Sequence, residues 1–238
     1  MQLFYTPHIE GDYAYFPEEE ARHCIQVLRK KVGAELQFVD GRGGWYRGEI
    51  VEAGKKTCVL SIKSKDLTYD PNSARLSLAV APTKNIARFE WLLEKATEIG
   101  VYEIIPLLCQ RSERKRIRKD RLEKILIAAM KQSLQSQLPL LRALTPFPAL
   151  LQQLATYSGQ RLIAHGGENH PIPLWEKYRS GGDVMVLIGP EGDFSPQELE
   201  AAFQNQMQAV SLGPNRLRTE TAGMVACHTI NLQNQLKQ

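Results

Sequence analysis

The sequence has few of the features that identify metal proteins, disulfide-rich proteins or membrane proteins. Only four of its 238 residues are cysteine, and no two form a C-x-x-C pair, which excludes the common zinc and thiol redox motifs. No apolar run approaches the ~18 residues of a membrane-spanning helix, and residues 1–5 lack a secretion signal. We therefore predict a cytoplasmic protein with reduced, buried cysteines: Cys24, Cys58, Cys109 and Cys227.

Two glycine patterns that mark common nucleotide sites are also missing. The chain contains neither the G-x-G-x-x-G of dinucleotide-binding domains nor the G-x-x-x-x-G-K-[ST] of triphosphate-binding loops. Its five histidines show no H-E-x-x-H or other ligand spacing, so we predict no metal site. These absences count against a metalloenzyme and against the common nucleotide-dependent α/β enzymes.

The net charge is small but concentrated in one segment. Overall the chain has 30 basic and 26 acidic residues, a balance that solubility alone would explain. Residues 111–124 hold eight basic residues against three acidic ones, whereas the rest of the chain holds 22 against 23. Such runs commonly neutralise nucleic-acid phosphates, although the solvated face of a long helix is the plain alternative. We favour contact with RNA or DNA.

The first 70 residues are predicted to form a small β domain. Strands with glycine-containing turns between the last three are expected at residues 3–5, 35–40, 45–52 and 57–64. A helix is expected to begin at Pro17. Short strands with few helices are typical of a small barrel or sandwich. The polar residues 65–73 indicate a linker, which separates a domain of residues 1–69 from one of residues 74–238.

Strands and helices alternate in the remainder, which predicts an α/β domain with a mostly parallel sheet. We expect strands at residues 76–81, 103–108, 161–165, 183–188 and 209–212. The expected helices are residues 85–99, 119–137 and 219–236, a short one around Trp175, and one that begins with a capping box at residues 195–198.

Two loops of this domain could carry chemistry, because ligands bind beyond the carboxyl ends of the strands in such sheets. Residues 188–195 contain Gly189 and Gly192, which allow backbone amides to approach a ligand closely. Residues 212–222 place two arginines, a glutamate and two threonines at the start of the last helix, where anions are favoured. A plain turn and an ordinary helix cap remain the alternatives. His165 follows another strand and could face the same crevice.

Several runs along the whole chain match one known family. In the C-terminal half they are Ile188-Gly189-Pro190-Glu191-Gly192, Phe194-Ser195, Glu198, Leu212-Gly213 and Leu217-Arg218-Thr219-Glu220-Thr221-Ala222. Before them stand His23, Val27-Leu28-Arg29, Gly33, Asp40-Gly41, Lys84, Lys95-Ala96-Thr97-Glu98, Gly100, Arg111-Ser112 and Gln132-Ser133. On these runs the chain resembles the ribosomal RNA small subunit methyltransferase E family of the SPOUT methyltransferases. It departs from the family pattern at Asp193, where glycine is usual, and at Leu134-Gln135, where Gly-Arg is usual.

The resemblance implies a fold, a cofactor and a reaction. It implies an α/β protein with an N-terminal small β-barrel, PUA-like and RNA-binding, and a C-terminal α/β SPOUT domain with a deep trefoil knot. The reaction would be S-adenosylmethionine-dependent methylation of N3 of a single uridine in 16S rRNA, naked or in the small ribosomal subunit. The active unit would be a homodimer, without metal or membrane. The implied cofactor-binding residues are Ala164, His165, Ile188, Gly189, Pro190, Glu191, Gly192, Leu212, Gly213, Leu217, Thr221 and Ala222.

Charged residues are predicted to act on the RNA. Uridine N3 must lose its proton before it can attack, and we predict that Arg218 stabilises the resulting anion. Glu220 would orient that arginine or accept the proton. The residues predicted to bind RNA are Arg22, Arg29, Arg111, Arg114, Lys115, Arg116, Arg118, Lys119 and Arg216.

Three other functions stay open at this point. The chain could be a SPOUT methyltransferase that acts on another RNA nucleoside. It could be a non-catalytic rRNA-binding assembly factor, which would need no cofactor pocket. A nucleotide-dependent α/β enzyme unrelated to RNA is the third, and the missing glycine patterns count against it.

Overall fold

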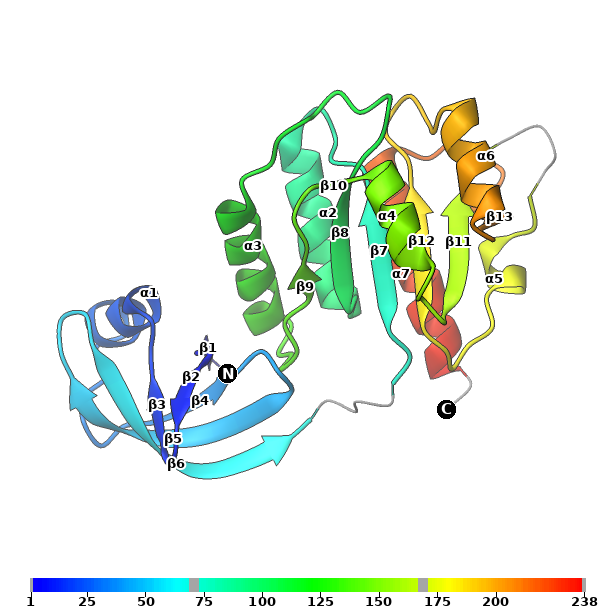
Figure 1. The fold of residues 1–238 in the computed structure, drawn as a ribbon. Helices are drawn as coiled ribbons and strands as arrows, with labels where there is room; N and C mark the ends of the chain where they lie inside the picture. Colours follow the sequence, from blue (N-terminus) through cyan, green and yellow to red (C-terminus); the bar gives the residue numbers. More distant parts are fainter. Residues whose placement is uncertain (1, 69–72, 167–170, 237–238) are drawn as a thin grey trace. The chain divides into compact units, whose positions relative to one another are not determined.

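The computed structural model describes residues 2–68, 73–166 and 171–236, which form two compact units (Figure 1). The N-terminal unit comprises the described part of Met1–Pro71 together with Ile127–Leu138, and the C-terminal unit comprises the described remainder. The predicted boundary falls largely on residues 69–72, which lie outside the described residues. The domain limits therefore stay a prediction.

The N-terminal unit is a curled six-stranded sheet with one short helical segment. The strands lie in the order β1 (Leu3–Tyr5), β4 (Glu35–Val39), β5 (Gly44–Ala53), β6 (Cys58–Leu67), β3 (Tyr13–Tyr15) and β2 (His8–Glu10). Between β5 and β6 the register shifts twice, and such bulges bend a sheet. Helix α1 (Glu18–Arg22) continues into a π-helical turn, η1 (His23–Val27). Strands β2 and β3, of three residues each, were not predicted.

The long helix predicted for residues 119–137 is shorter. Helix α3 (Lys119–Gln132) ends five residues earlier, because Leu134 adopts a φ of 55°, which a right-handed helix does not allow. Beyond it, Gln137 forms bridges with Gly41 and Arg42 of the N-terminal unit. In the same unit Met130 packs against residues of β1 and β4. The prediction of helix up to residue 137 was therefore wrong.

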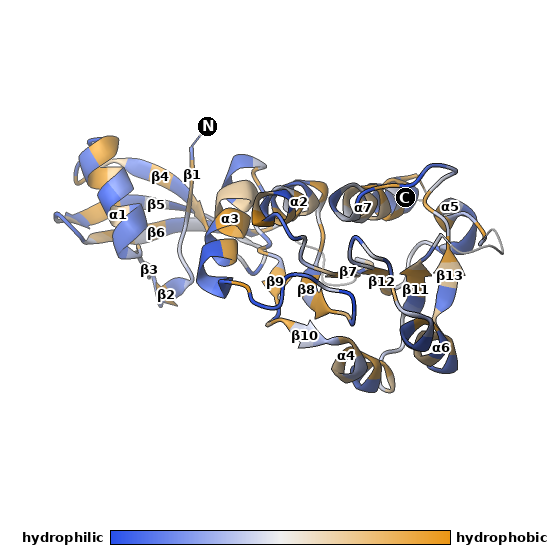
Figure 2. Ribbon diagram, turned by 90° about the horizontal axis from the view of Figure 1, so that it is seen from above, coloured by the Kyte–Doolittle hydropathy of each residue, from blue (hydrophilic) through white to orange (hydrophobic). Residues whose placement is uncertain are grey.

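The C-terminal unit is a parallel sheet covered by helices on both faces (Figure 2). The strands lie in the order β10 (Thr145–Pro146), β8 (Glu103–Leu108), β7 (Leu76–Val80), β12 (Val184–Ile188), β11 (Gln160–Ala164) and β13 (Gln208–Val210), and β9 (Leu140–Leu141) also pairs with β8. One face carries α2 (Ile86–Ile99) and α7 (Thr219–Gln235), and the other carries α4 (Phe147–Leu154) and α6 (Pro196–Gln204). Burial on both faces explains why β7 and β12 are apolar along their whole length.

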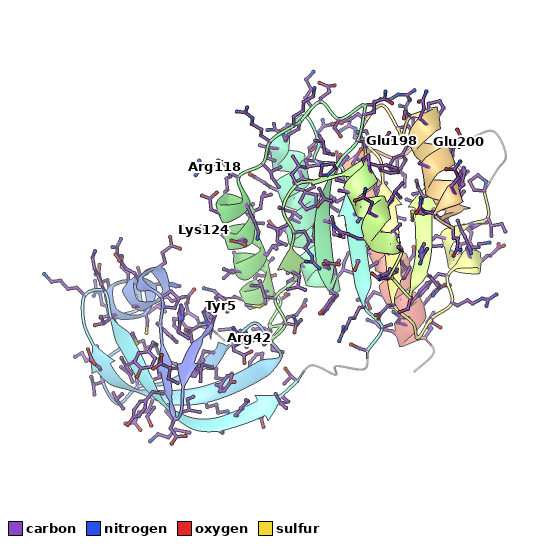
Figure 3. The ribbon with its side chains drawn as sticks, viewed as in Figure 1. Tyr5, Arg42, Arg118, Lys124, Glu198 and Glu200 are labelled. Carbon is purple, nitrogen blue, oxygen red and sulfur yellow. The ribbon has the colours of Figure 1, made fainter. Side chains whose placement is uncertain are left out.

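Helix ends in this unit follow local chemistry. Asn85 caps α2 by accepting a hydrogen bond from the backbone N–H of Ala87, and Gly100 ends the helix at a φ of 103°. Ser195 and Glu198 form the predicted capping box of α6, and Figure 3 shows Glu198 near the start of that helix. Helix α4 was not predicted, whereas α5 (Leu174–Lys177) is the short helix expected around Trp175. Throughout the described ranges, every helix is too short or too polar to cross a bilayer.

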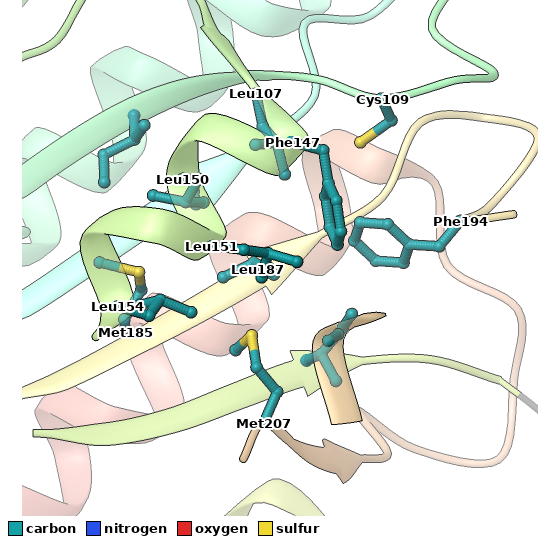
Figure 4. Close-up of a cluster of buried hydrophobic side chains, with 14 of the residues drawn as sticks. Leu107, Cys109, Phe147, Leu150, Leu151, Leu154, Met185, Leu187, Phe194 and Met207 are labelled. Carbon is teal, nitrogen blue, oxygen red and sulfur yellow. The ribbon is translucent and has the colours of Figure 1, made fainter. Parts of the chain in front are cut away.

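A buried cluster anchors the loop after β12 to the sheet. The rings of Phe147 on α4 and Phe194 in that loop lie 5.7 Å apart, above Leu187 of β12 (Figure 4). Phe194 is 2% exposed, so the end of the loop is held by the core. This packing leaves the preceding residues, 189–193, at the carboxyl edge of the sheet.

Candidate active site

Three loops meet at the carboxyl edge of the parallel sheet. Residues 165–166 follow β11, residues 189–195 follow β12 and residues 211–218 follow β13. Strand β11 pairs with both β12 and β13, so the three loops leave neighbouring strands. They surround a cavity of about 1100 Å³, large enough for a cofactor-sized ligand.

Most of the residues predicted to bind the cofactor line this cavity. Those that do are Ala164, His165, Ile188, Gly189, Pro190, Glu191, Leu212, Gly213, Leu217 and Ala222. Gly192 and Thr221 are not among its lining residues. Arg216, Arg218 and Glu220 also line it, so both predicted catalytic residues lie at the same cavity.

The loop after β12 needs small residues and a left-handed turn. A Cβ atom at Gly189 would lie 3.1 Å from the ring of Phe194, so a side chain would displace that ring. Asp193, at the position that departs from the family pattern, has a φ of 61°. Its carboxylate accepts a hydrogen bond from the backbone N–H of Phe194 at 2.8 Å and lies 3.2 Å from Nδ1 of His165. The side chain of Asp193 thus connects two of the three loops.

The loop before α7 reaches the other side of the cavity. Gly213 has a φ of 133° with open space where a Cβ would stand, and its N–H donates to the hydroxyl of Ser211. Arg218 occupies the N-cap position without capping through its side chain. The hydroxyl of Thr219 instead donates to the carbonyl of Gly189 at 3.0 Å, which ties the start of α7 to the loop after β12.

Glu220 is a buried carboxylate at the cavity wall. It is 7% exposed, and its charged partner within the described residues is Arg88 on α2, with Nε 3.7 Å from Oε1. Arg218 is exposed and makes no ion pair with Glu220 among the described residues. The predicted orientation of Arg218 by Glu220 therefore stays a prediction. Arg88 lines the cavity but was not predicted, although its position just after β7 points to the same edge of the sheet.

The basic side chains of residues 111–119 differ in their contacts: some make hydrogen bonds or ion pairs, and others are exposed without a partner. Arg111 and Arg114 donate to backbone carbonyls of the loops around residues 192–194 and 83–84. Arg118 and Lys119 pair with acidic neighbours at 3.1 and 3.4 Å. Lys115 and Arg116 are exposed and make no ion pair or side-chain hydrogen bond within the part of the chain that the structure describes.

The remaining predicted RNA-binding residues occupy two other places. Arg22 and Arg29 lie in the N-terminal unit, where Arg22 pairs with Glu18 at 2.6 Å and Arg29 has a φ of 55°. Arg216 lies at the cavity, with Nη2 3.4 Å from the carbonyl of Glu191. Among the described residues, no three His, Cys, Asp or Glu side chains come together as metal ligands.

Comparison with known proteins assigns both units to RNA methyltransferases. A family model described as an RNA methyltransferase domain matches residues 70–231, and one described as an RNA methyltransferase PUA domain matches residues 16–63. A Ribosomal RNA small subunit methyltransferase E from Rickettsia conorii is 31% identical, over 90% of this chain and 87% of its own length.

Solved structures agree with this assignment. A probable rRNA-methyltransferase from Porphyromonas gingivalis is 41% identical, with a TM-score of 0.90 and full coverage of both chains. A Ribosomal RNA small subunit methyltransferase E from Neisseria gonorrhoeae, bound to S-adenosyl methionine, is 25% identical, with a TM-score of 0.84 and 98% coverage of both chains. The predicted fold class, a PUA-like sheet followed by a SPOUT α/β domain, is confirmed. The chain therefore belongs to the RNA methyltransferase family, within the ribosomal RNA small subunit methyltransferase E group.

Proposed function

We propose that this chain is a cytoplasmic, S-adenosylmethionine-dependent methyltransferase that modifies N3 of a single uridine in 16S rRNA. One observation carries the proposal: three loops of the matched methyltransferase domain enclose a cavity at the carboxyl edge of its sheet. The relatives named above supply the substrate class and the cofactor. A homodimer that binds the small ribosomal subunit, with no metal and no membrane, is part of the same proposal.

The cavity residues suit S-adenosylmethionine. Its wall combines apolar side chains such as Ile188, Leu212 and Leu217 with backbone groups of three loops, which fits an adenosine. Gly213 leaves open space that a side chain would occupy. Glu191 and Glu220 line the cavity too, and carboxylates suit a cationic ligand. When bound, the cofactor supplies a methyl group on a sulfonium for in-line displacement.

The chain's own residues would prepare the uridine. The base must be unpaired or turned out of its helix before N3 can be reached. Glu220 would accept the N3 proton, and Arg88 beside it would hold the carboxylate in place. Arg218 would stabilise the charge that spreads over O2 and O4 of the base. Alignment of N3 with the methyl group supplies much of the rate.

RNA phosphates would be bound mainly outside the cavity. Lys115 and Arg116 are exposed in the basic segment, with Arg118 and Lys119 beside them. Arg22 and Arg29 would contribute from the N-terminal unit, and Arg216 from the cavity. Affinity for rRNA should therefore fall as salt rises.

Mass spectrometry of small-subunit rRNA tests the reaction directly. A strain that lacks this protein should lose one 3-methyluridine, and the wild-type gene should restore it. Genes encoding Arg218→Ala or Glu220→Gln should restore little, whereas a Thr156→Ser gene, altered at an exposed residue outside the cavity lining, should restore it fully. Loss of a different methylated nucleoside would favour another RNA target. If S-adenosylmethionine gave no heat of binding in calorimetry, a non-catalytic assembly factor would be favoured.

A further inference from the structure

Arg111 and Arg114 are the first two basic residues of the basic segment. Their guanidinium groups donate hydrogen bonds to backbone carbonyls of neighbouring loops. Nη1 of Arg111 donates to the carbonyls of Gly192 at 2.8 Å and Phe194 at 3.3 Å. A Cβ built on Gly192 would lie 3.4 Å from Cβ of Arg111 and 3.5 Å from its Cδ, so the aliphatic stem also packs against the loop. Arg111 thus contacts the loop after β12 with both its charge and its stem.

Arg114 makes the same kind of contact with a second loop. Its Nε donates to the carbonyl of Thr83 at 2.9 Å, and its Nη2 donates to the carbonyl of Lys84 at 2.5 Å. Thr83 is 1% exposed, so one end of this contact is buried. The residues from 81 to 85 join β7 to α2, and Arg88 lies in the first turn of that helix.

The two loops are also joined to each other and to the basic segment. The backbone N–H of Lys84 donates to Oε1 of Glu191 at 2.9 Å. Nζ of Lys84 lies 2.8 Å from Oε2 of Glu113, and this contact raises the pKa of Lys84, with a smaller contribution from Glu191. The N–H of Gln110 donates to Glu198 at 2.7 Å. Residues 110–114 therefore hold both loops at several points.

Bonds to carbonyls restrict peptide units that adjoin the cavity lining. A peptide unit is planar, so a fixed carbonyl also fixes the N–H that follows it. The N–H after Gly192 belongs to Asp193 and donates to the carbonyl of Pro190 at 2.9 Å. Hydrogen bonds from a charged donor are stronger than neutral ones, so loss of Arg111 should loosen this turn beside the cavity.

We propose that Arg111 and Arg114 are positioning residues that brace the two loops for the cofactor, whereas the neighbouring Lys115 and Arg116 bind RNA phosphates. The proposal rests on the proposed function and refines it, because it divides one basic run into two roles. The contrast is clear within the six positions 111–116: two basic side chains donate to backbone carbonyls, and two have no partner among the described residues.

Paired measurements on the full chain test the division. Arg111→Gln and Arg114→Gln should each weaken S-adenosylmethionine binding in calorimetry by about tenfold or more, since each removes charged hydrogen bonds. Their affinity for purified 16S rRNA should keep the wild-type salt dependence. Lys115→Gln and Arg116→Gln are the matched controls. Each should reduce the slope of log affinity against log salt by about 0.7–0.9 and leave cofactor binding unchanged.

Two further readouts separate positioning from general folding. Arg111→Lys keeps one charged donor and the stem, so it should recover part of the lost cofactor affinity. Amide hydrogen exchange without cofactor should be faster at residues 192–195 in Arg111→Gln, with an unchanged unfolding midpoint. Wild-type cofactor affinity in both glutamine variants, or a salt slope reduced as in Lys115→Gln, would overturn the division. Failure of the wild-type chain to bind S-adenosylmethionine would refute the proposed function. The hydrogen-exchange result would still test whether Arg111 holds the loop after β12 in place.

Discussion

The hydroxyl of Thr219 is the direct link between the last helix and the loop after β12, and its removal should have a measurable cost. Thr219 is 6% exposed, and its Oγ1 lies 3.0 Å from the carbonyl oxygen of Gly189. Thr219→Val keeps the shape of the side chain and removes the donor. The carbonyl of Gly189 then loses this partner, at the wall of the cavity.

The magnitude depends on whether water can replace the hydroxyl. An unsatisfied buried group costs about 1–3 kcal/mol. In the free protein the cavity admits water to Gly189, so the lower figure applies, and the midpoint of thermal unfolding should fall by about 2–4 °C. A bound cofactor would exclude that water, so the carbonyl of Gly189 would then have the full cost of an unsatisfied buried group. The difference, about 1–2 kcal/mol, should weaken S-adenosylmethionine binding by about 5–30-fold.

Calorimetry and thermal unfolding of three proteins check this reasoning. Thr219→Ser keeps the hydroxyl and should stay near wild type in cofactor affinity, although it loses a methyl group. Thr156→Val removes an exposed hydroxyl outside the cavity lining and should leave affinity unchanged. If the Val and Ser variants at position 219 bound the cofactor equally well, the hydroxyl would not be the link between these elements.

Three other predictions concern stability and reactivity. Asp193 has a φ of 61°, which glycine adopts freely, so Asp193→Ala should cost about 1 kcal/mol relative to Asp193→Gly, and equal unfolding midpoints would contradict this strain. Arg142→Met leaves the carboxylate of Glu103, which is 7% exposed, without its ion-pair partner. Because the arginine side chain is 61% exposed and water can partly replace it, urea unfolding should show a loss of about 1–2 kcal/mol. Arg22→Met, at an exposed pair, should leave the midpoint unchanged. Burial raises the pKa of Cys227 to about 12, so an aromatic disulfide reagent at pH 8 should label it only after unfolding, and fast labelling of the native chain would be inconsistent with that burial.

Elements with local signals were predictable from the sequence. Helix α2 begins and ends where Asn85 and Gly100 indicate, because cap residues act over a few positions. The hairpin of β2 and β3 was missed, since six residues around Gly11 leave too little pattern. The end of α3 was placed too late because the left-handed conformation of Leu134 has no sequence signal.

The candidate site depended on information that no local pattern holds. Its loops were identified from the family motifs, but their meeting requires β11 to lie between β12 and β13, which is not their order in the chain. The same limit explains why Arg88 was missed: it approaches Glu220 from a helix more than 130 positions earlier. Arg111 and Arg114 look like Lys115 and Arg116 in the sequence, and only the carbonyls in front of them distinguish the two pairs.

The charges that line the cavity indicate that the cofactor and the RNA depend on different charged side chains. Its lining holds three cationic and three anionic side chains: Arg88, Arg216, Arg218, Glu191, Asp193 and Glu220. A cavity balanced in this way does not repel a cationic sulfonium, as a basic one would, and it does not by itself attract a polyanion. Attraction of rRNA must then come mainly from exposed cations outside it. Within the basic segment, Lys115 and Arg116 make no ion pair among the described residues. Under the proposed function, added salt should therefore weaken RNA binding steeply and cofactor binding only slightly, because the two ligands depend on different charges.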